Sequence, residues 1–421
     1  MERAVSSVMR VLIVSTDDLT GGAGKAAYRL HRALLKFGVQ SHMLVQNKVS
    51  ADSTVEGRSG FKGRLLSRVR SRLDRLLLLG TEQAFFSPGM LPSSSLSSAV
   101  KRIKPDIVNI HWVNGGFCSM AEISRVQQPM VVSLHDMWAF TAGCHYAGTC
   151  KRYESECNSC PGLKSTPLLD LSSLLFHRKR KYFQRIPNLV INGLSGWIAS
   201  AASKSSIHTD RDVVNLPNCI DTNLYKPLNR NEALKALGLR PGRKYILFGA
   251  AGIADERKGY GYLEAALQTL ELEAVDAVFV GQPPERPELP IPYHIFGEVR
   301  DEQRMAALYS VADVVVVPSI QENLSNMIME AMSCGTPVVA FDIGGNADLI
   351  KHLETGYLVR NISPESLAVG ISFLLDSIDE DWMSNQCISH IRDNFSEAVV
   401  AKRYCDLFAS VIVRNGNPEG T

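Results

Sequence analysis

The sequence has no long apolar run and no excess of charge of either sign, and these absences exclude two classes of protein. Its 421 residues include 45 lysines and arginines against 43 aspartates and glutamates, a formal net charge of +2. Nucleic-acid-binding proteins normally carry a strong basic excess, so we expect no nucleic-acid partner. No apolar run approaches the roughly 20 residues that a membrane-spanning helix needs.

The N-terminus also lacks the pattern of a secretory signal. Residues 1–10 are polar, and the apolar run Val11–Ser15 is far too short for a signal core. We therefore expect a cytoplasmic protein. In that compartment the nine cysteines stay reduced, and a close cluster of them indicates a metal site rather than disulfides.

Short apolar runs alternate with segments of helical spacing in two successive series. The first series has apolar runs at Val11–Ser15, Asp106–Trp112, Met130–Asp136 and Val213–Asp221. The second has them at Lys244–Gly252, Ala277–Gly281, Tyr293–Val299, Ala312–Ser319 and Thr336–Asp342. Strands that alternate with helices form parallel sheets covered by helices on both faces.

The sequence therefore predicts an α/β fold with two doubly wound, Rossmann-like domains that face one another across a cleft. We assign residues 1–225 to the first domain and 226–395 to the second. Residues 396–421 are expected to form a helix that packs back on the first domain. Ligands of such sheets bind beyond the carboxyl ends of the strands, so the candidate site residues are sought there.

The stretch QENLSNMIMEAMSCGTPVVAF, Gln321–Phe341, predicts a helix that begins near Ser325. Gly335 ends the helix and Pro337 forbids its continuation. The free N–H groups and the positive dipole end of the helix form a site for a phosphate or diphosphate. The backbone amides that would bind it belong to Leu324, Ser325 and Asn326.

Three charged residues extend this site. Glu322 precedes the helix and can project toward whatever the diphosphate carries. Glu330 lies about one and a half turns inside, where its carboxylate could accept two hydrogen bonds from a ribose diol. Lys258 follows the first strand of the second series and offers a point charge for a diphosphate. The plain alternatives are a solvated Glu322, a surface ion pair at Glu330 and an exposed loop lysine.

The order of these motifs resembles the retaining glycosyltransferases of the GT-B fold, family four (glycosyl transferases group 1). The resemblance rests on Pro217–Asp221, Arg257–Gly259, Pro318–Ser319, the glutamates at positions 322 and 330, and Cys334–Val339. It implies that Glu322 contacts the hydroxyls of the donor sugar, that Glu330 holds the ribose, and that Lys258 and the amides hold the diphosphate. It also implies a nucleotide-sugar donor and no cofactor or divalent metal for catalysis.

Two positions depart from this family. Gly252 stands where the family often has an arginine, and Ser325 replaces a glycine. Both changes concern the donor site rather than the fold.

In the first series, Gly21 and Gly22 lie in an expected turn between the first strand and the first helix, and His135 ends the run MVVSL. By themselves these are an ordinary turn and a structural histidine. The resemblance implies that the glycine loop lies against the donor phosphates and that His135 lies beside the reacting sugar, orienting it and stabilising charge near C1. It also implies that no protein nucleophile is needed.

The segment 143–163 contains four cysteines within seventeen residues. Four thiolates in one loop fit a tetrahedral structural zinc, with His145 as an alternative ligand; two disulfides and unligated thiols are the other possibilities. The segment resembles a subgroup of these transferases associated with capsule, colanic acid or exopolysaccharide assembly. The cysteines are Cys144, Cys150, Cys157 and Cys160.

We therefore expect a hexosyltransferase that retains anomeric configuration and uses a saccharide or polyprenyl-diphosphate-linked acceptor. The segment Gly57–Gly80 mixes arginines with leucines at helical spacing. It fits a helix that lies on an anionic membrane surface near such an acceptor, and equally a solvated helix with one core face. The other functions considered are a non-catalytic sugar-nucleotide-binding scaffold of the same fold and an enzyme that acts on a small soluble acceptor.

Overall fold

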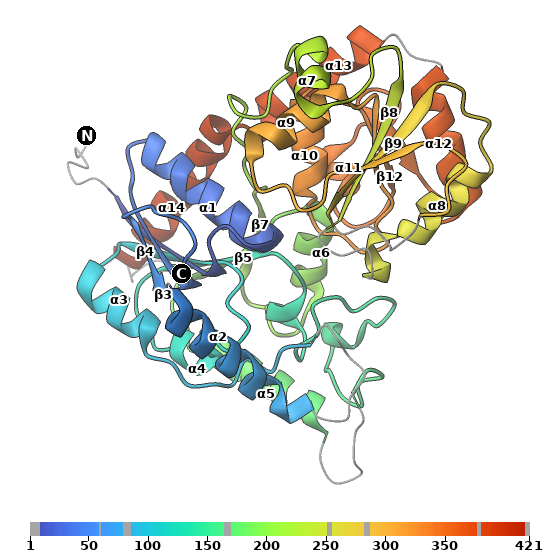
Figure 1. The fold of residues 1–421 in the computed structure, drawn as a ribbon. Helices are drawn as coiled ribbons and strands as arrows, with labels where there is room; N and C mark the ends of the chain where they lie inside the picture. The colour runs from blue at the N-terminus through green and yellow to red at the C-terminus, as the bar shows by residue number, and fades with distance from the viewer. Residues whose placement is uncertain are drawn as a thin grey trace. The chain divides into compact units, whose positions relative to one another are not determined.

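The computed structural model describes residues 9–58, 60–78, 86–163, 170–250, 255–281, 287–376 and 380–416. The chain divides into two compact units (Figure 1). The first unit contains residues up to Cys219 and from Val400 onward, and the second contains Ile220–Val399.

A seven-stranded parallel sheet forms the centre of the first unit, in the order β3-β2-β1-β4-β5-β6-β7. Its strands are β1 (Arg10–Asp17), β2 (Gln40–Asn47), β3 (Val55–Arg58), β4 (Ile107–Ile110), β5 (Met130–Leu134), β6 (Leu189–Gly193) and β7 (Asp212–Asn215). Its helices are α1 (Gly21–Lys36), α2 (Gly60–Asp74), α3 (Ser95–Ile103), α4 (Met120–Ile123), α5 (Leu171–Gln184), α6 (Gly196–Lys204) and α14 (Glu397–Gly416).

The second unit is built around a six-stranded parallel sheet, in the order β10-β9-β8-β11-β12-β13. Its strands are β8 (Lys244–Ala250), β9 (Val275–Gly281), β10 (Tyr293–Ile295), β11 (Val314–Val317), β12 (Val338–Phe341) and β13 (Gly356–Val359). Its helices are α7 (Arg230–Leu237), α8 (Tyr260–Gln268), α9 (Glu302–Val311), α10 (Asn326–Ser333), α11 (Asn346–Leu349), α12 (Pro364–Asp376) and α13 (Glu380–Phe395). The prediction of two parallel-sheet α/β units is confirmed.

Helices cover both faces of the first sheet. One core layer joins the sheet to α1 and to α14, which contributes the buried residues Val400, Tyr404 and Phe408. The other layer joins the sheet to α3, α5 and α6. Two-sided burial explains why the central strands read as continuous apolar runs.

The structure changes one local expectation. Gly21 and Gly22 do not lie in the turn after β1 but form the first residues of α1, with the bend confined to positions 18–20. Gly21 has a φ of 71°, a left-handed conformation that glycine adopts without strain. No helix among the described residues has the length and apolar character to cross a membrane.

Two buried histidines in the first unit have lowered pKa values. His31 bonds to Ser41 Oγ at 2.7 Å and to Thr54 Oγ1 at 2.8 Å, and burial lowers its pKa to about 4. His208 packs edge-on against Phe183 at a ring distance of 4.8 Å, and burial lowers its pKa to about 3. Both rings are therefore neutral in the folded state at neutral pH.

We predict that the free energy of unfolding falls as pH drops below about 6.5, the ordinary histidine pKa that applies to the unfolded chain. Between that pH and the depressed folded-state pKa, the unfolded state binds more protons than the folded state. Each such histidine then contributes a slope of about 1.4 kcal/mol per pH unit. Denaturant unfolding at a series of pH values measures this slope.

The variant His208→Phe should reduce the slope, because it removes a buried histidine whose pKa is lowered in the folded state. An equal slope in the His208→Phe variant would contradict the assignment of His208 as a buried neutral group.

Candidate functional site

In the second sheet, the strand order reverses direction between β8 and β11. From β8 the chain continues to β9 and β10 on one side, and then returns to β11 on the other side of β8. Ligands of doubly wound sheets bind at the carboxyl ends of the strands at such a switch point. Lys258 lies after β8 and Glu322 lies after β11.

Lys258 and Glu322 meet at this switch point. Lys258 Nζ donates to Glu322 Oε2 at 2.8 Å, and both side chains keep some exposure to solvent. The ammonium group carries three N–H donors, so one bond to Glu322 leaves donors for an anionic ligand. The two residues that were predicted separately thus form one ion pair.

The backbone around this ion pair is tightly packed. Ile320 N donates to Arg257 O at 2.8 Å, which joins the two loops. A Cβ at Gly259 would lie 1.9 Å from Pro318 O, and one at Gly344 would lie 1.7 Å from Glu322 O. Both glycines also have a positive φ, so any other residue there would push the loops apart.

Helix α10 begins at the predicted place. Ser325 is its N-cap, and its Oγ accepts from Ile328 N at 3.4 Å. The serine that replaces the family's glycine thus caps the helix, and its φ of −74° requires no glycine. Leu324 and Ser325 are buried, and Asn326 is the first helical residue.

Glu330 is buried inside α10, at 8% exposure, instead of forming a surface ion pair. Tyr309 donates its hydroxyl to Glu330 Oε2 at 2.9 Å. Burial and the Glu330 charge raise the pKa of Tyr309 well above its usual value, so the tyrosine remains a donor. A carboxylate offers about four acceptor positions, of which Tyr309 occupies one.

In the first unit, the site residues at the carboxyl ends of β4 and β5 form a hydrogen-bonded series. Asn109 Nδ2 donates to Val131 O at 3.1 Å, which orients the amide. Asn109 Oδ1 therefore accepts from His111 Nε2, at 2.8 Å. Burial and the nearby ring of His135 lower the pKa of His111 well below its usual value, so its only ring proton is on Nε2.

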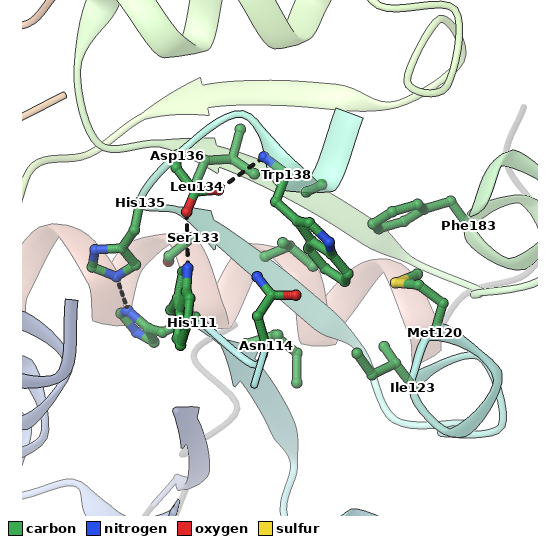
Figure 2. A pocket seen from close by; sticks show the side chains of 14 residues that line it. His111, Asn114, Met120, Ile123, Ser133, Leu134, His135, Asp136, Trp138 and Phe183 are labelled. Carbon is green, nitrogen blue, oxygen red and sulfur yellow. Dashed lines mark hydrogen bonds between the residues drawn. The ribbon is translucent and has the colours of Figure 1, made fainter. Parts of the chain in front are cut away.

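His111 in turn determines the tautomer of His135. The neutral His111 ring has an unprotonated Nδ1. This nitrogen accepts a hydrogen bond from His135 Nε2 at 2.8 Å (Figure 2). Burial lowers the pKa of His135 to about 4, so this ring is neutral as well. His135 Nδ1 is then an acceptor, and His135 offers a ligand a lone pair rather than a positive charge.

The sequence analysis did not identify Asn109, His111 or Tyr309. A signal for the first two was present: Asn109 and His111 are two positions apart in the run NIHW, so they project from the same face of the strand. Tyr309 lies on α9 and carries no local signal, because its contact with Glu330 is a tertiary one.

A small pocket lies beside the histidine pair, with Asn114 at its wall together with Met120, Trp138 and Phe183 (Figure 2). Its volume is about 20 Å³. Such a volume holds about one water molecule and not a sugar ring.

The four cysteines of the segment 143–163 are free thiols, and Cys144 lies within electrostatic range of Cys150 and Cys160. Burial raises the pKa of Cys144 to about 11 and that of Cys157 to about 12. Across the residues that the structure describes, no three His, Cys, Asp or Glu side chains have metal-binding geometry. Zinc at these thiols therefore stays a prediction.

Two other features bear on a metal at this place. His145, the alternative ligand, has both ring nitrogens engaged: Nδ1 lies 2.6 Å from Asp136 Oδ2, and Nε2 lies 2.9 Å from Ser87 Oγ. It is therefore a poor zinc ligand. Burial lowers the pKa of Lys179 to about 7, whereas Cys144 and Cys157, within electrostatic range, act to raise it, so zinc-bound thiolates would favour its charged form.

Solved structures similar to this chain have the GT-B fold. Sucrose-phosphate synthase from Thermosynechococcus elongatus matches with a TM-score of 0.69 and 16% identity, covering 96% of this chain and 99% of that one. Anabaena HepE, solved in complex with UDP-glucose, matches with a TM-score of 0.65 and 16% identity, covering 96% and 100%. The two units thus have the architecture of GT-B glycosyltransferases, as predicted.

The sequence match is more specific and lies in the second unit. Residues 243–377 match the family described as Glycosyl transferases group 1. The D-inositol 3-phosphate glycosyltransferase of Corynebacterium glutamicum (strain R) is 36% identical over 127 residues, which are 30% of this chain and 30% of that protein. The chain spans less than half of the length of the curated relatives that it matches.

We predict that His111 and His135 remain neutral Nε2–H tautomers from neutral pH down to about pH 5, because His111 is buried, His135 is half-buried and desolvated, and His111 accepts from His135. Nitrogen-15 NMR of the imidazole rings measures both tautomer and protonation. The variant His111→Phe should remove the fixed tautomer of His135. An imidazolium form of His135 at about pH 6 would contradict the neutral series.

We further predict about one zinc ion per chain in purified protein, measured by mass spectrometry of the metal content. The double variant Cys157→Ser, Cys160→Ser should lose it. The control Cys118→Ser, Cys405→Ser, which changes two cysteines outside this segment, should retain it. A metal-free protein with an unchanged melting temperature would reject the zinc site.

Proposed function

We propose that this chain transfers a hexosyl group from a nucleotide-sugar donor to a saccharide acceptor, with retention of configuration at the anomeric carbon. One observation carries the proposal. The Lys258–Glu322 ion pair lies at the switch point of the second sheet, inside the segment that matches Glycosyl transferases group 1.

Each donor group in the second unit suits one part of a nucleotide sugar. Glu322 accepts hydrogen bonds from sugar hydroxyls, and Glu330 accepts them from the ribose. Lys258 and the amides at the start of α10 bind the diphosphate. The similarity to HepE, which was solved with UDP-glucose, supports a ligand of this class. Gly252, where the family often has an arginine, lies outside the described residues.

In the proposed reaction, the C1–O bond to the diphosphate breaks as the acceptor hydroxyl attacks C1 from the same face. The hydroxyl proton passes to a diphosphate oxygen, and Lys258 stabilises the charge that develops on the leaving group. A neutral His135 accepts a hydrogen bond from the sugar and orients it, and does not act as a cation near C1. Gly21 and Gly22, at the start of α1, would approach the donor phosphates. No cofactor takes part.

For the acceptor, we propose a lipid-linked saccharide in cell-surface polysaccharide synthesis, at the inner face of the cell membrane. The cysteine-rich segment next to His135 supports the subgroup associated with capsule, colanic acid and exopolysaccharide assembly. The relatives named as D-inositol 3-phosphate glycosyltransferases favour a second candidate, an enzyme with a small soluble acceptor.

We predict that UDP or GDP, or one of their sugars, raises the melting temperature, because a ligand that binds only the folded state stabilises it by mass action. The variant Glu330→Gln should weaken nucleotide binding roughly tenfold to a hundredfold, because it removes charge-assisted hydrogen bonds to the ribose. Calorimetric titration measures the affinity.

The matched control is the variant Glu354→Gln. Glu354 is exposed and lies just before the amino end of β13, whereas the candidate site lies at the carboxyl ends of the strands. An unchanged affinity in Glu330→Gln would contradict the ribose role. Nucleotide binding without sugar transfer or donor hydrolysis, over a panel of lipid-linked and inositol phosphate acceptors, would instead favour a non-catalytic scaffold.

A further inference from the structure

Helix α2, Gly60–Asp74 (Figure 1), packs on the rest of the first unit through polar side chains. The side chains that turn inward belong to Ser67, Arg70 and Asp74. Arg70 donates to Gly116 O at 2.7 Å and to Pro92 O at 2.9 Å. Asp74 accepts from Met90 N at 3.1 Å and is buried.

The apolar residues of α2 face solvent. They recur at every fourth position, which places them in one row along the helix. The row contains Phe61, Leu65, Val69 and Leu73, which are 77%, 50%, 42% and 46% exposed. Leu66, beside this row, is also exposed, as is Leu76 just beyond the helix. The alternative of a solvated helix with one apolar core face therefore does not hold for α2, although Leu78, beyond the helix, is buried in the core.

A basic row lies next to the apolar row. Arg64, Arg68 and Arg72 each precede an apolar residue of the row by one position, and all three are exposed. Lys62 is exposed as well, whereas Asp74, the single acidic residue of the helix, is buried. The exposed surface of α2 thus combines large apolar side chains with positive charge and contains no negative charge.

The combination of exposed apolar side chains and positive charge indicates which kind of surface could cover the helix. A second copy of α2 would bring two positive rows together, which is unfavourable. An anionic lipid surface accepts both rows, because apolar side chains enter the acyl region while arginines bind lipid phosphates. We propose that α2 is a docking surface for an anionic lipid bilayer, with the row Phe61–Leu65–Val69–Leu73 inserted and the arginines at the headgroups.

The proposal does not rest on the proposed sugar transfer, since membrane binding is measured without donor or acceptor. If both hold, α2 brings the first unit to the surface where a lipid-linked acceptor resides. Vesicle flotation tests it with the full-length protein. Vesicles of phosphatidylcholine with about a third phosphatidylglycerol are compared with pure phosphatidylcholine, at low and at physiological salt.

We predict that the protein floats with the anionic vesicles and not with the neutral ones, and that salt weakens the binding. The variant Leu65→Ser, Val69→Ser and the variant Arg64→Gln, Arg68→Gln, Arg72→Gln should each lower the bound fraction about tenfold. A tryptophan introduced by Phe61→Trp should shift its emission to the blue on anionic vesicles only.

Matched controls make equal changes elsewhere on the surface. Val369→Ser, Val413→Ser replaces two exposed apolar residues, and Arg300→Gln, Arg392→Gln, Lys402→Gln removes three exposed charges. Both controls should bind as the unaltered protein does. The α2 variants should keep the melting temperature, the oligomeric state and any nucleotide-induced thermal shift.

Four results would overturn the proposal. The first is no flotation with anionic vesicles, and the second is equal losses in the α2 and control variants. The third is a dimer that dissociates in the Leu65→Ser, Val69→Ser variant, which would assign α2 to a contact between copies. The fourth is a fall of several degrees in its melting temperature, which would show that another part of the chain covers the apolar row.

Discussion

The parallel direction of the strands is the constraint on which both candidate sites depend. In a parallel sheet all strands present their carboxyl ends at one edge, and the switch point separates the loops that follow its two central strands. In the second sheet these are the loops after β8 and β11, which carry Lys258 and Glu322. Their 2.8 Å contact joins residues 64 positions apart, and the glycines at 259 and 344 permit the close backbone approach around it.

In the first sheet, the parallel direction of the strands brings buried polar side chains of neighbouring strands together. Polar side chains on the neighbouring strands β4, β5 and β6 face one another: Asn109 Nδ2 donates to Ser133 Oγ at 3.0 Å, and Asn192 Nδ2 donates to the Tyr404 hydroxyl at 2.8 Å. Tyr404 belongs to α14, near the end of the chain. Buried polar groups of this kind are costly unless each finds a partner, so they favour one arrangement of the strands and of α14. The orientation of His135 therefore depends on residues that lie far from it in sequence.

The sequence alone predicts much of this architecture. Strands buried on both faces appear as runs such as VLIVS and DVVVV, and the start and the end of α10 follow from Ser325 and Gly335. Strand β3, VEGR, was not predicted because it is a short, polar strand at the sheet edge. The pairing of Lys258 with Glu322, of Tyr309 with Glu330 and of His111 with His135 could not be predicted either. Each is a long-range contact whose geometry is set by strand order, which local patterns do not contain.

Helix α2 shows where local patterning and tertiary structure disagree. Its spacing satisfies the rule for an amphipathic helix, and that rule predicts an apolar face toward the core. In the structure the polar side of α2 faces the rest of the unit, because Arg70 and Asp74 are hydrogen-bonded to backbone groups of neighbouring loops. Rotating the apolar row inward would break these bonds and bury unpaired charge. Exceptions to local folding rules are expected at functional or strained sites. For α2 we propose that an anionic lipid surface supplies the missing apolar environment, because such a surface also accepts a row of arginines.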